Sequence, residues 1–106
     1  MTNRERLPNR RLSITTEFTH ETQKFFLTTG FIGNKVMEIF LNSSQKSGSE
    51  ADINASDAAI AVSLAIQYGC PMDVLRHAMR RNADGSPTGP ISHALDIAKE
   101  IEESIT

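Results

Sequence analysis

The sequence predicts one α+β domain of order βββααα, a three-stranded antiparallel meander followed by three helices packed on one sheet face. Between residues 11 and 42, apolar and polar residues alternate with period two, and Thr, Phe, Ile and Val are frequent, which is typical of strands. Beyond residue 52, apolar residues recur at helical spacing in stretches separated by Gly and Pro. A run of strands followed by a run of helices indicates an α+β fold.

Length, cysteine content and charge limit the class of protein. The 106 residues suffice for one domain that buries about 60–70% of its unfolded surface. The single cysteine excludes an intramolecular disulfide and fits a reducing cytoplasm. No apolar run is long enough to span a membrane, and the basic start lacks the apolar stretch of a secretory signal. Because the net charge is −2, general attraction to nucleic acid is not expected. We therefore expect a cytoplasmic protein that does not associate with membranes.

The whole chain, residues 1–106, is predicted to be one domain with four regions. A basic arm (1–10) precedes the sheet (11–42), a polar linker (43–51) follows it, and the helices occupy residues 52–105. The arm is rich in arginine and the end of the chain is acidic, so the two ends could attract each other within or between subunits. Two solvated ends are the simpler interpretation.

The strands are expected near residues 11–19, 24–31 and 36–42, and their turns fix the register. Gly33-Asn34 is typical of a two-residue hairpin turn, and the first turn is centred on Glu21-Thr22. The expected opposite pairs are Phe31–Val36, Leu27–Phe40, Phe26–Leu41, Thr28–Ile39, Phe18–Phe25 and Ile14–Thr29.

This register predicts that the sheet is apolar on both faces, since opposite partners share a face. The core face comprises Leu12, Ile14, Phe18, Phe25, Leu27, Phe31, Val36 and Phe40. The other face carries Phe26, Ile32, Met37, Ile39 and Leu41, and is too apolar to remain in water. We therefore predict an interface formed by Phe26, Met37, Ile39 and Leu41, through which the chain forms a homodimer or docks on a larger partner.

Capping residues and apolar spacing place the first helix. Asp52 is its expected N-cap, and Gly69 is expected to end it in a left-handed conformation. The helix is also indicated by four apolar residues at helical spacing, Ile53, Ile60, Ala61 and Leu64.

Proline marks the starts of the next two helices. Pro71 begins the second, and Pro90 begins the third after a loop at residues 82–89. The predicted buried stripe of the second helix is Leu75, Ala78 and Met79. That of the third is Ile91, Leu95, Ala98, Ile101 and Ile105.

The sequence offers few groups for catalysis or metal binding. Cys70 follows a helix and precedes another, where a thiol pKa can be lowered, but no orienting third group accompanies it, and a small buried or capping residue is the favoured interpretation. His20, His77 and His93 lack the tight pairing of zinc ligands, so no metal site is expected. The acidic residues inside the strands are expected on opposite faces, so we predict no catalytic residues.

Arginines near the Gly-rich loop are candidates for binding an anion or nucleotide. They precede a helix start, where free amides favour negative charge, although the loop lacks the lysine and hydroxyl of a P-loop. A solvated arginine face is the competing interpretation. The candidate contacts are Arg10, Arg11, Arg76, Arg80, Arg81, Gly85 and Gly89.

The order of motifs resembles the TSCPD domain. The resemblance covers about residues 7–99 and is carried by LPNRR (7–11), MEIFLN (37–42), DINASDAAIAVSLAIQYGCP (52–71) and LRHAMRRNADGSPTGPISHALD (75–96). This module is found at the C-terminal end of adenosylcobalamin-dependent (class II) ribonucleotide reductases and as short stand-alone proteins.

The resemblance implies the fold and an association with ribonucleotide reduction, and hence with DNA precursor synthesis. The family's catalytic cysteines and cobalamin site belong to a separate domain, so it transfers no catalytic residue and no cofactor to this chain. We therefore expect a non-catalytic binding or assembly module, with a homodimer or a reductase subunit as partner. The alternatives are a part of a ribonucleoside-diphosphate reductase, and a nucleotide or nucleic acid binder that uses the arginines.

Overall fold

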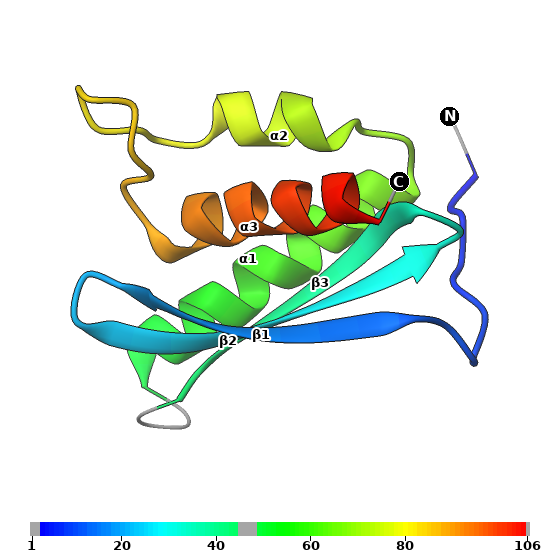
Figure 1. The fold of residues 1–106 in the computed structure, drawn as a ribbon, viewed down its shortest axis with the longest axis horizontal. Coiled ribbons are helices and arrows are strands. Elements are labelled where there is room, and N and C mark those ends of the chain that lie inside the picture. Colours follow the sequence, from blue (N-terminus) through cyan, green and yellow to red (C-terminus); the bar gives the residue numbers. More distant parts are fainter. Residues whose placement is uncertain (1–2, 45–48, 106) are drawn as a thin grey trace.

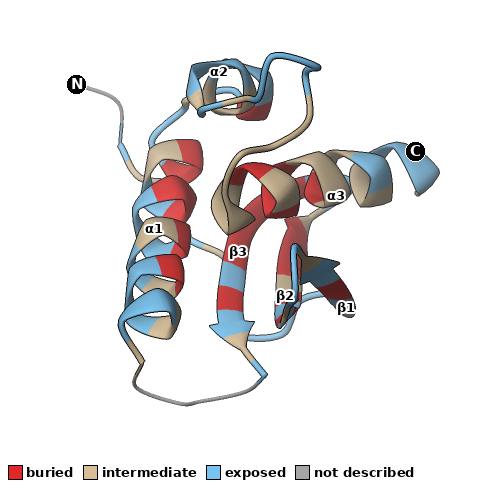
Figure 2. Cartoon of the chain, turned by 90° about the vertical axis from the view of Figure 1, so that its left-hand side faces the viewer, coloured by how far each residue is buried: buried red, intermediate tan, exposed pale blue. Residues whose placement is uncertain are grey.

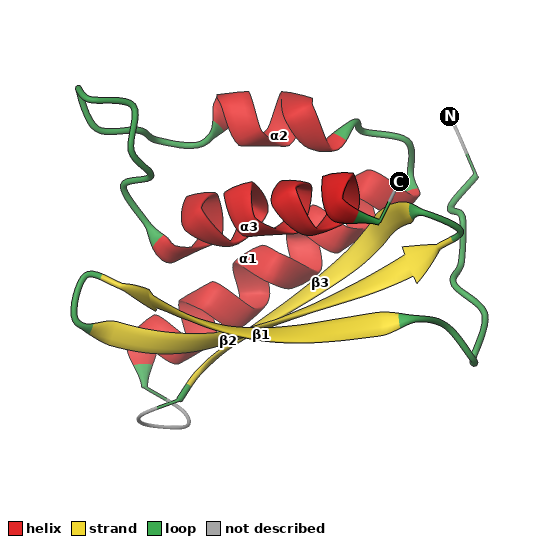
Figure 3. Cartoon of the chain, in the orientation of Figure 1, coloured by secondary structure: helices red, strands yellow, loops and turns green. Residues whose placement is uncertain are grey.

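The computed structural model describes residues 3–44 and 49–105 and has the predicted α+β architecture. The strands β1 (Ser13–His20), β2 (Gln23–Ile32) and β3 (Lys35–Ser43) form one antiparallel sheet of order β1-β2-β3. The helices α1 (Glu50–Gln67), α2 (Met72–Ala78) and α3 (Pro90–Ser104) follow and lie on one side of the sheet, with α2 farthest from it (Figures 1 and 3). Part of the predicted linker, residues 45–48, lies outside the described residues.

The register between β1 and β2 is confirmed, but most of the register between β2 and β3 is wrong. Phe31 pairs with Val36 as predicted, and a β-bulge between Gly30 and Phe31 then shifts the remaining pairs by one residue. Leu27 is consequently opposite Leu41 instead of Phe40. Because side chains alternate with period two, this single extra residue exchanges the faces of the rest of β3.

The bulge changes which residues are exposed. Met37, Ile39 and Leu41, predicted to form an exposed interface with Phe26, are instead buried in the core. Phe40, predicted in the core, is 43% exposed on the face that the helices leave open. The predicted four-residue interface is therefore wrong for all of its members except Phe26, which is 39% exposed.

The open face of the sheet is mainly polar. Thr15 and Thr28 share a hydrogen bond across β1 and β2 (2.9 Å between their Oγ1 atoms), and Lys24 pairs with Glu17 (3.8 Å). Phe26 lies opposite Asn42, whereas Phe40 lies opposite Thr28, so the two phenylalanines are diagonal neighbours on adjacent strands. One solvated face is ordinary for an antiparallel sheet, and the two phenylalanines are its exception.

Gly30 leaves room for the side chain of Glu38, which forms a partly buried ion pair with Arg11. A Cβ atom at position 30 would lie 2.6 Å from Cγ of Glu38. The Glu38 carboxylate accepts a hydrogen bond from Nε of Arg11 (2.5 Å), and Arg11 also donates to the Pro8 carbonyl (2.9 Å). The LPNRR segment is therefore anchored to β3 through its last arginine.

Helix boundaries follow the capping residues. Ser49 is the N-cap of α1, since its side chain accepts from the Asp52 amide (3.2 Å); the predicted cap, Asp52, is wrong by one turn. Gly69 has φ +106° directly after the helix, as predicted. Pro90 is the first residue of α3.

The predicted buried stripe of α2 is confirmed only in part. Leu75 and Met79 pack against the core as expected, but Ala78 is exposed and Met72 is buried instead. In α3, Leu95 and Ala98 are fully buried, and the rest of its predicted apolar stripe packs around them. Among the described residues, no helix has the length and apolar character needed to cross a membrane.

Helix α1 runs along the outer edge of β3, where strand backbone groups would otherwise lack partners (Figure 2). The Ile39 amide donates to Oγ of Ser63 (2.8 Å), and the Ser63 hydroxyl donates to the Ile39 carbonyl (2.9 Å). Gln67 donates from Nε2 to the carbonyl of Met37 at the bulge (3.1 Å). A hydrogen-bonding side of α1 therefore replaces a fourth strand.

Side chains of α1 also bind the C-terminal end of this edge. Ser56 donates to the Leu41 carbonyl (3.0 Å), and the Ser43 amide donates to Asp52 (2.8 Å). Alternate residues of β3 from Met37 to Ser43 thus meet α1 residues from Gln67 to Asp52, because the two segments advance by similar distances, about 20 and 22 Å.

Candidate functional site at the Gly-Pro loop

Asp96 on α3 holds the loop that joins α2 to α3. Arg81 donates two hydrogen bonds to the Asp96 carboxylate (2.8 and 2.6 Å), and Nε of Arg76 donates a third (3.2 Å). The two bonds from Arg81, followed by the one from Arg76, lower the pKa of Asp96 against the opposing effect of burial. Asp96 is therefore a charged anchor for two arginines from the loop and from α2.

The loop itself is ordered by its own backbone and polar side chains. Arg81 and Pro87 form an isolated β-bridge, and the Asn82 amide donates to the Ser86 carbonyl (2.9 Å). Gly85 at the tip has φ +87°, a left-handed conformation that glycine adopts without strain. These bonds occupy the inner backbone groups of the hairpin.

Two histidines meet below this loop. Nδ1 of His20, at the end of β1, lies 3.0 Å from Nδ1 of His93 on α3, and Nε2 of His20 lies 3.1 Å from the Thr88 carbonyl. A carbonyl only accepts, so His20 donates from Nε2; in its neutral form its Nδ1 then accepts from His93. The His93 ring also packs on Phe18 (4.7 Å between centroids).

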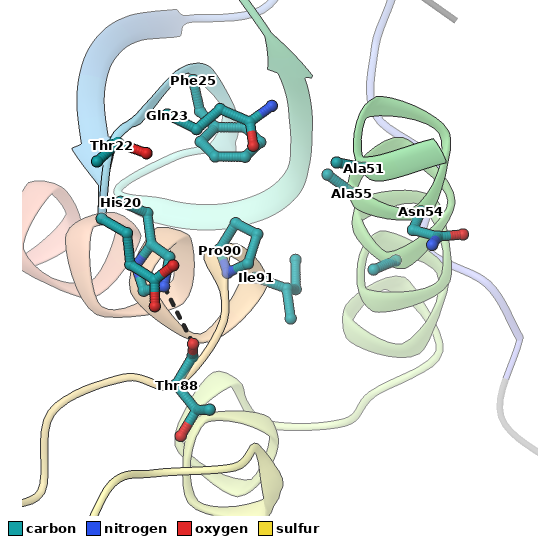
Figure 4. Close-up of a pocket in the computed structure, with 12 residues that line it drawn as sticks. His20, Thr22, Gln23, Phe25, Ala51, Asn54, Ala55, Thr88, Pro90 and Ile91 are labelled. Atoms are coloured by element: carbon teal, nitrogen blue, oxygen red, sulfur yellow. Dashed lines mark hydrogen bonds between the residues drawn. The ribbon is translucent and has the colours of Figure 1, made fainter. Parts of the chain in front are cut away.

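A cavity of about 490 Å³ opens beside His20. Its apolar wall includes Phe25 and Ala55, and the start of α3 closes one side with Pro90 and Ile91. Figure 4 shows the side chains of β2, α1 and α3 that surround it, with the bond from His20 to Thr88 at its edge. The cavity lies where three elements converge, so its shape depends on the position of the loop.

A family model for the TSCPD domain matches residues 2–105. The chain belongs to the TSCPD domain family. It is similar to a protein named vitamin B12-dependent ribonucleotide reductase from Agrobacterium fabrum, with 39% identity over 71 residues. That match covers 66% of this chain and 6% of the relative, so the chain spans a small part of the length of that enzyme. No solved structure gives a significant match.

The structure divides the candidate anion contacts of this TSCPD domain between two places. Arg10 and Arg11 precede β1, at the opposite end of the molecule from the Gly-Pro loop (Figure 1). Around the loop, Arg76 and Arg81 are engaged by Asp96, whereas Arg80 is exposed.

The two glycines of the set lie in the loop region. Gly85 is at the loop tip, where its carbonyl accepts from Arg81 (3.3 Å), and Gly89 is the N-cap of α3. The predicted contacts therefore do not converge on one surface.

Cys70 and His77 lie away from the histidine pair. The Cys70 thiol lies 3.7 Å from the Pro71 carbonyl, and His77 is exposed on α2. Within residues 3–44 and 49–105, no three His, Cys, Asp or Glu side chains form a group that could hold a metal ion. Sequence reasoning missed the pairing of His20 with His93, since the two residues are 73 positions apart and neither carries a local signal.

We expect His93 to make the TSCPD domain less stable at mildly acidic pH. Burial, followed by the neighbouring charge of His20, lowers the pKa of His93, and Asp96 and Glu100 oppose this only in part. The unfolded chain therefore takes up the proton first, and stability falls as the pH drops below the ordinary value of 6.5.

Chemical denaturation at a series of pH values should show this loss between neutral pH and the range where carboxylates titrate. His93→Gln should remove it, and His77→Gln, an exposed control, should keep it. An unchanged pH dependence in His93→Gln would assign the loss to other groups.

Proposed function

We propose that this TSCPD domain is a non-catalytic module that binds the catalytic part of a vitamin B12-dependent ribonucleotide reductase and contributes to its assembly. The observation that carries the proposal is the open sheet face, on which Phe26 and Phe40 are 39% and 43% exposed as diagonal neighbours. Aromatic side chains are enriched at the centres of protein interfaces, and the polar residues around this pair are suited to a rim.

The chemistry of the chain supports a binding role. Thiyl-radical reduction of a nucleotide needs several cysteines, and this sequence has one. At the Gly-Pro loop, Asp96 is engaged by Arg81 and Arg76, and His20 by His93 and Thr88. In this proposal the cobalamin and the reacting cysteines are supplied by the enzyme, and the TSCPD domain holds no cofactor of its own.

The relative supports the choice of partner. It is named as a vitamin B12-dependent ribonucleotide reductase, and the matched region is 6% of its length. A segment that makes up so small a share of the enzyme fits an accessory part more readily than the whole catalytic machinery. The role of the module would then lie in the synthesis of DNA precursors.

The test combines binding and turnover. The reductase of Agrobacterium fabrum is prepared without the segment that matches this chain, and association is measured by biolayer interferometry alongside nucleotide reduction. We expect binding, no nucleotide reduction by the TSCPD domain alone, and at least about tenfold weaker binding for Phe26→Ser, because loss of an aromatic anchor typically costs 2 kcal/mol or more. Val74→Ser, at an exposed apolar position on α2, is the matched control.

Three outcomes would overturn parts of the proposal. Turnover by the isolated chain would make it an enzyme. Failure to bind either the truncated or the complete reductase would refute the reductase as the partner. Equal binding by Phe26→Ser and the unsubstituted chain would remove the open sheet face as the docking surface.

A further inference from the structure

Helix α1 is apolar on the side that faces away from the sheet. Ile53, Ile60, Leu64 and Tyr68 are 49%, 51%, 38% and 46% exposed. They are seven, four and four positions apart, so the helical repeat of 3.6 residues places them along one side. We call these four residues the outer stripe.

The outer stripe lies on a helix that is already packed on its other side. Ala55, Ala59, Val62 and Ile66 are buried against the rest of the domain. A surface helix of a monomer normally presents charged and polar residues to water on its outer side. Scattered exposed apolar residues are common, but these four follow one another over about 22 Å of helix, at a rise of 1.5 Å per residue.

The net charges at the two ends of the outer stripe have opposite sign, since Arg4 and Arg6 outnumber Glu5 at the C-terminal end. Glu50 and Asp57 are exposed in the N-terminal half of α1. At the C-terminal end, Arg4 donates to the Gln67 side chain (2.6 Å) and the Glu5 amide donates to the Gln67 carbonyl (2.8 Å). These two bonds hold the basic arm, which includes the exposed Arg6, beside the end of the helix.

The charges of one copy complement those of a second copy only when the two α1 helices lie antiparallel. If two copies of α1 lie antiparallel, the acidic half of each faces the basic arm of the other. If they lie parallel, acidic residues face acidic residues and arginines face arginines. A two-fold axis between the copies produces this antiparallel arrangement, and it pairs the acidic half of one helix with the basic arm of the other at both ends. Two-fold symmetry is the commonest symmetry of homo-oligomers.

We propose that the outer stripe is the interface of a homodimer in which α1 packs antiparallel against α1 of a second copy. The axis passes close to Ile60, which is near the middle of the stripe, so Ile60 meets Ile60 of the second copy. Ile53 lies toward the second copy's Tyr68. This surface is separate from the open sheet face, so the dimer can form with or without a reductase.

The first test measures mass in solution by sedimentation equilibrium over a wide concentration range. We expect a dimer for the unsubstituted chain and at least about a hundredfold weaker association for Ile60→Glu, because two carboxylates would face each other at the axis. Val74→Glu, at another exposed apolar position, should remain dimeric. Both variants should retain the fold by circular dichroism, since neither side chain belongs to the core.

The second test determines orientation by disulfide cross-linking in a Cys70→Ser background. Oxidation with copper phenanthroline takes two electrons and two protons from a pair of thiols and joins them. Ile60→Cys should cross-link efficiently, because the axis brings the two copies of this position together. Ile53→Cys should not, because antiparallel helices place its two copies at opposite ends of the stripe.

Each contrary result has a definite meaning. A monomer at every concentration overturns the dimer. A dimer that persists in Ile60→Glu but dissociates in Phe26→Glu places the interface on the open sheet face. Equal cross-linking of Ile60→Cys and Ile53→Cys indicates a parallel pair and overturns the charge argument.

Discussion

Leu41→Ala is expected to lower the free energy of unfolding by about 2–5 kcal/mol, the usual cost of emptying a buried leucine site. Leu41 lies on the covered face of β3 opposite Leu27, and both side chains are fully enclosed. Equilibrium unfolding in urea, with the slope compared between variants, measures the change.

Phe40→Ala is the matched control, since Phe40 is the next residue toward the N-terminus and lies on the open face. Its side chain is 43% exposed, so the expected loss is below about 1 kcal/mol, despite the larger side chain that is removed. The regular hairpin register predicts the reverse order of the two losses. A larger loss for Phe40→Ala would therefore refute the bulge between Gly30 and Phe31.

Ser63→Ala is expected to cost about 2–4 kcal/mol of stability. The Ser63 hydroxyl bonds both the amide and the carbonyl of Ile39 in the interior, and its removal leaves two buried backbone groups without these partners. The same unfolding measurement applies. Faster amide hydrogen exchange at Ile39 should accompany the loss, because that amide would have lost its acceptor.

Ser92→Ala is the control for a buried serine on a helix. Ser92 is 2% exposed, and its hydroxyl has no hydrogen-bond partner among the described residues. Removing a hydroxyl that is already unsatisfied should be neutral or stabilise by up to about 1 kcal/mol. Similar losses for Ser63→Ala and Ser92→Ala would show that volume, rather than the hydrogen bonds to β3, determines the effect.

The order of elements could be predicted from the sequence, because turns, caps and periodicity are local signals. The tip at Glu21-Thr22 led to the correct pairing of Phe18 with Phe25. The second hairpin failed because a bulge depends on how two strands fit together. Gly30, inside a strand, was the available signal, since an interior glycine often marks a bulge or a close approach.

Helix α1 shows why periodicity alone does not identify the buried side. Ser56, Ser63 and Gln67 recur at helical spacing and resemble a solvated side, but they bond the edge of β3. Ile53 and Ile60, which mark the helix by their spacing, are exposed. A polar side can be buried where it replaces a strand, and the sequence does not reveal that requirement.

The candidate site was predictable only in its local part. The loop and its arginines could be located because Gly and Pro mark loops. Their partner Asp96 is 15 positions beyond Arg81, and no spacing rule connects the two. The pairing of His20 with His93 depends on where β1 ends relative to α3, which is a property of the tertiary structure.

The side chains that occupy the edge of β3 also limit how this domain can polymerise. New strands can join only along β1, so native molecules cannot stack into an endless ribbon. If two copies paired through β1, the resulting sheet would have three strands from each copy. Both of its outer edges would be β3 strands covered by α1. The continuous sheet would end at the pair, which protects the fold from fibre growth through its strand edges.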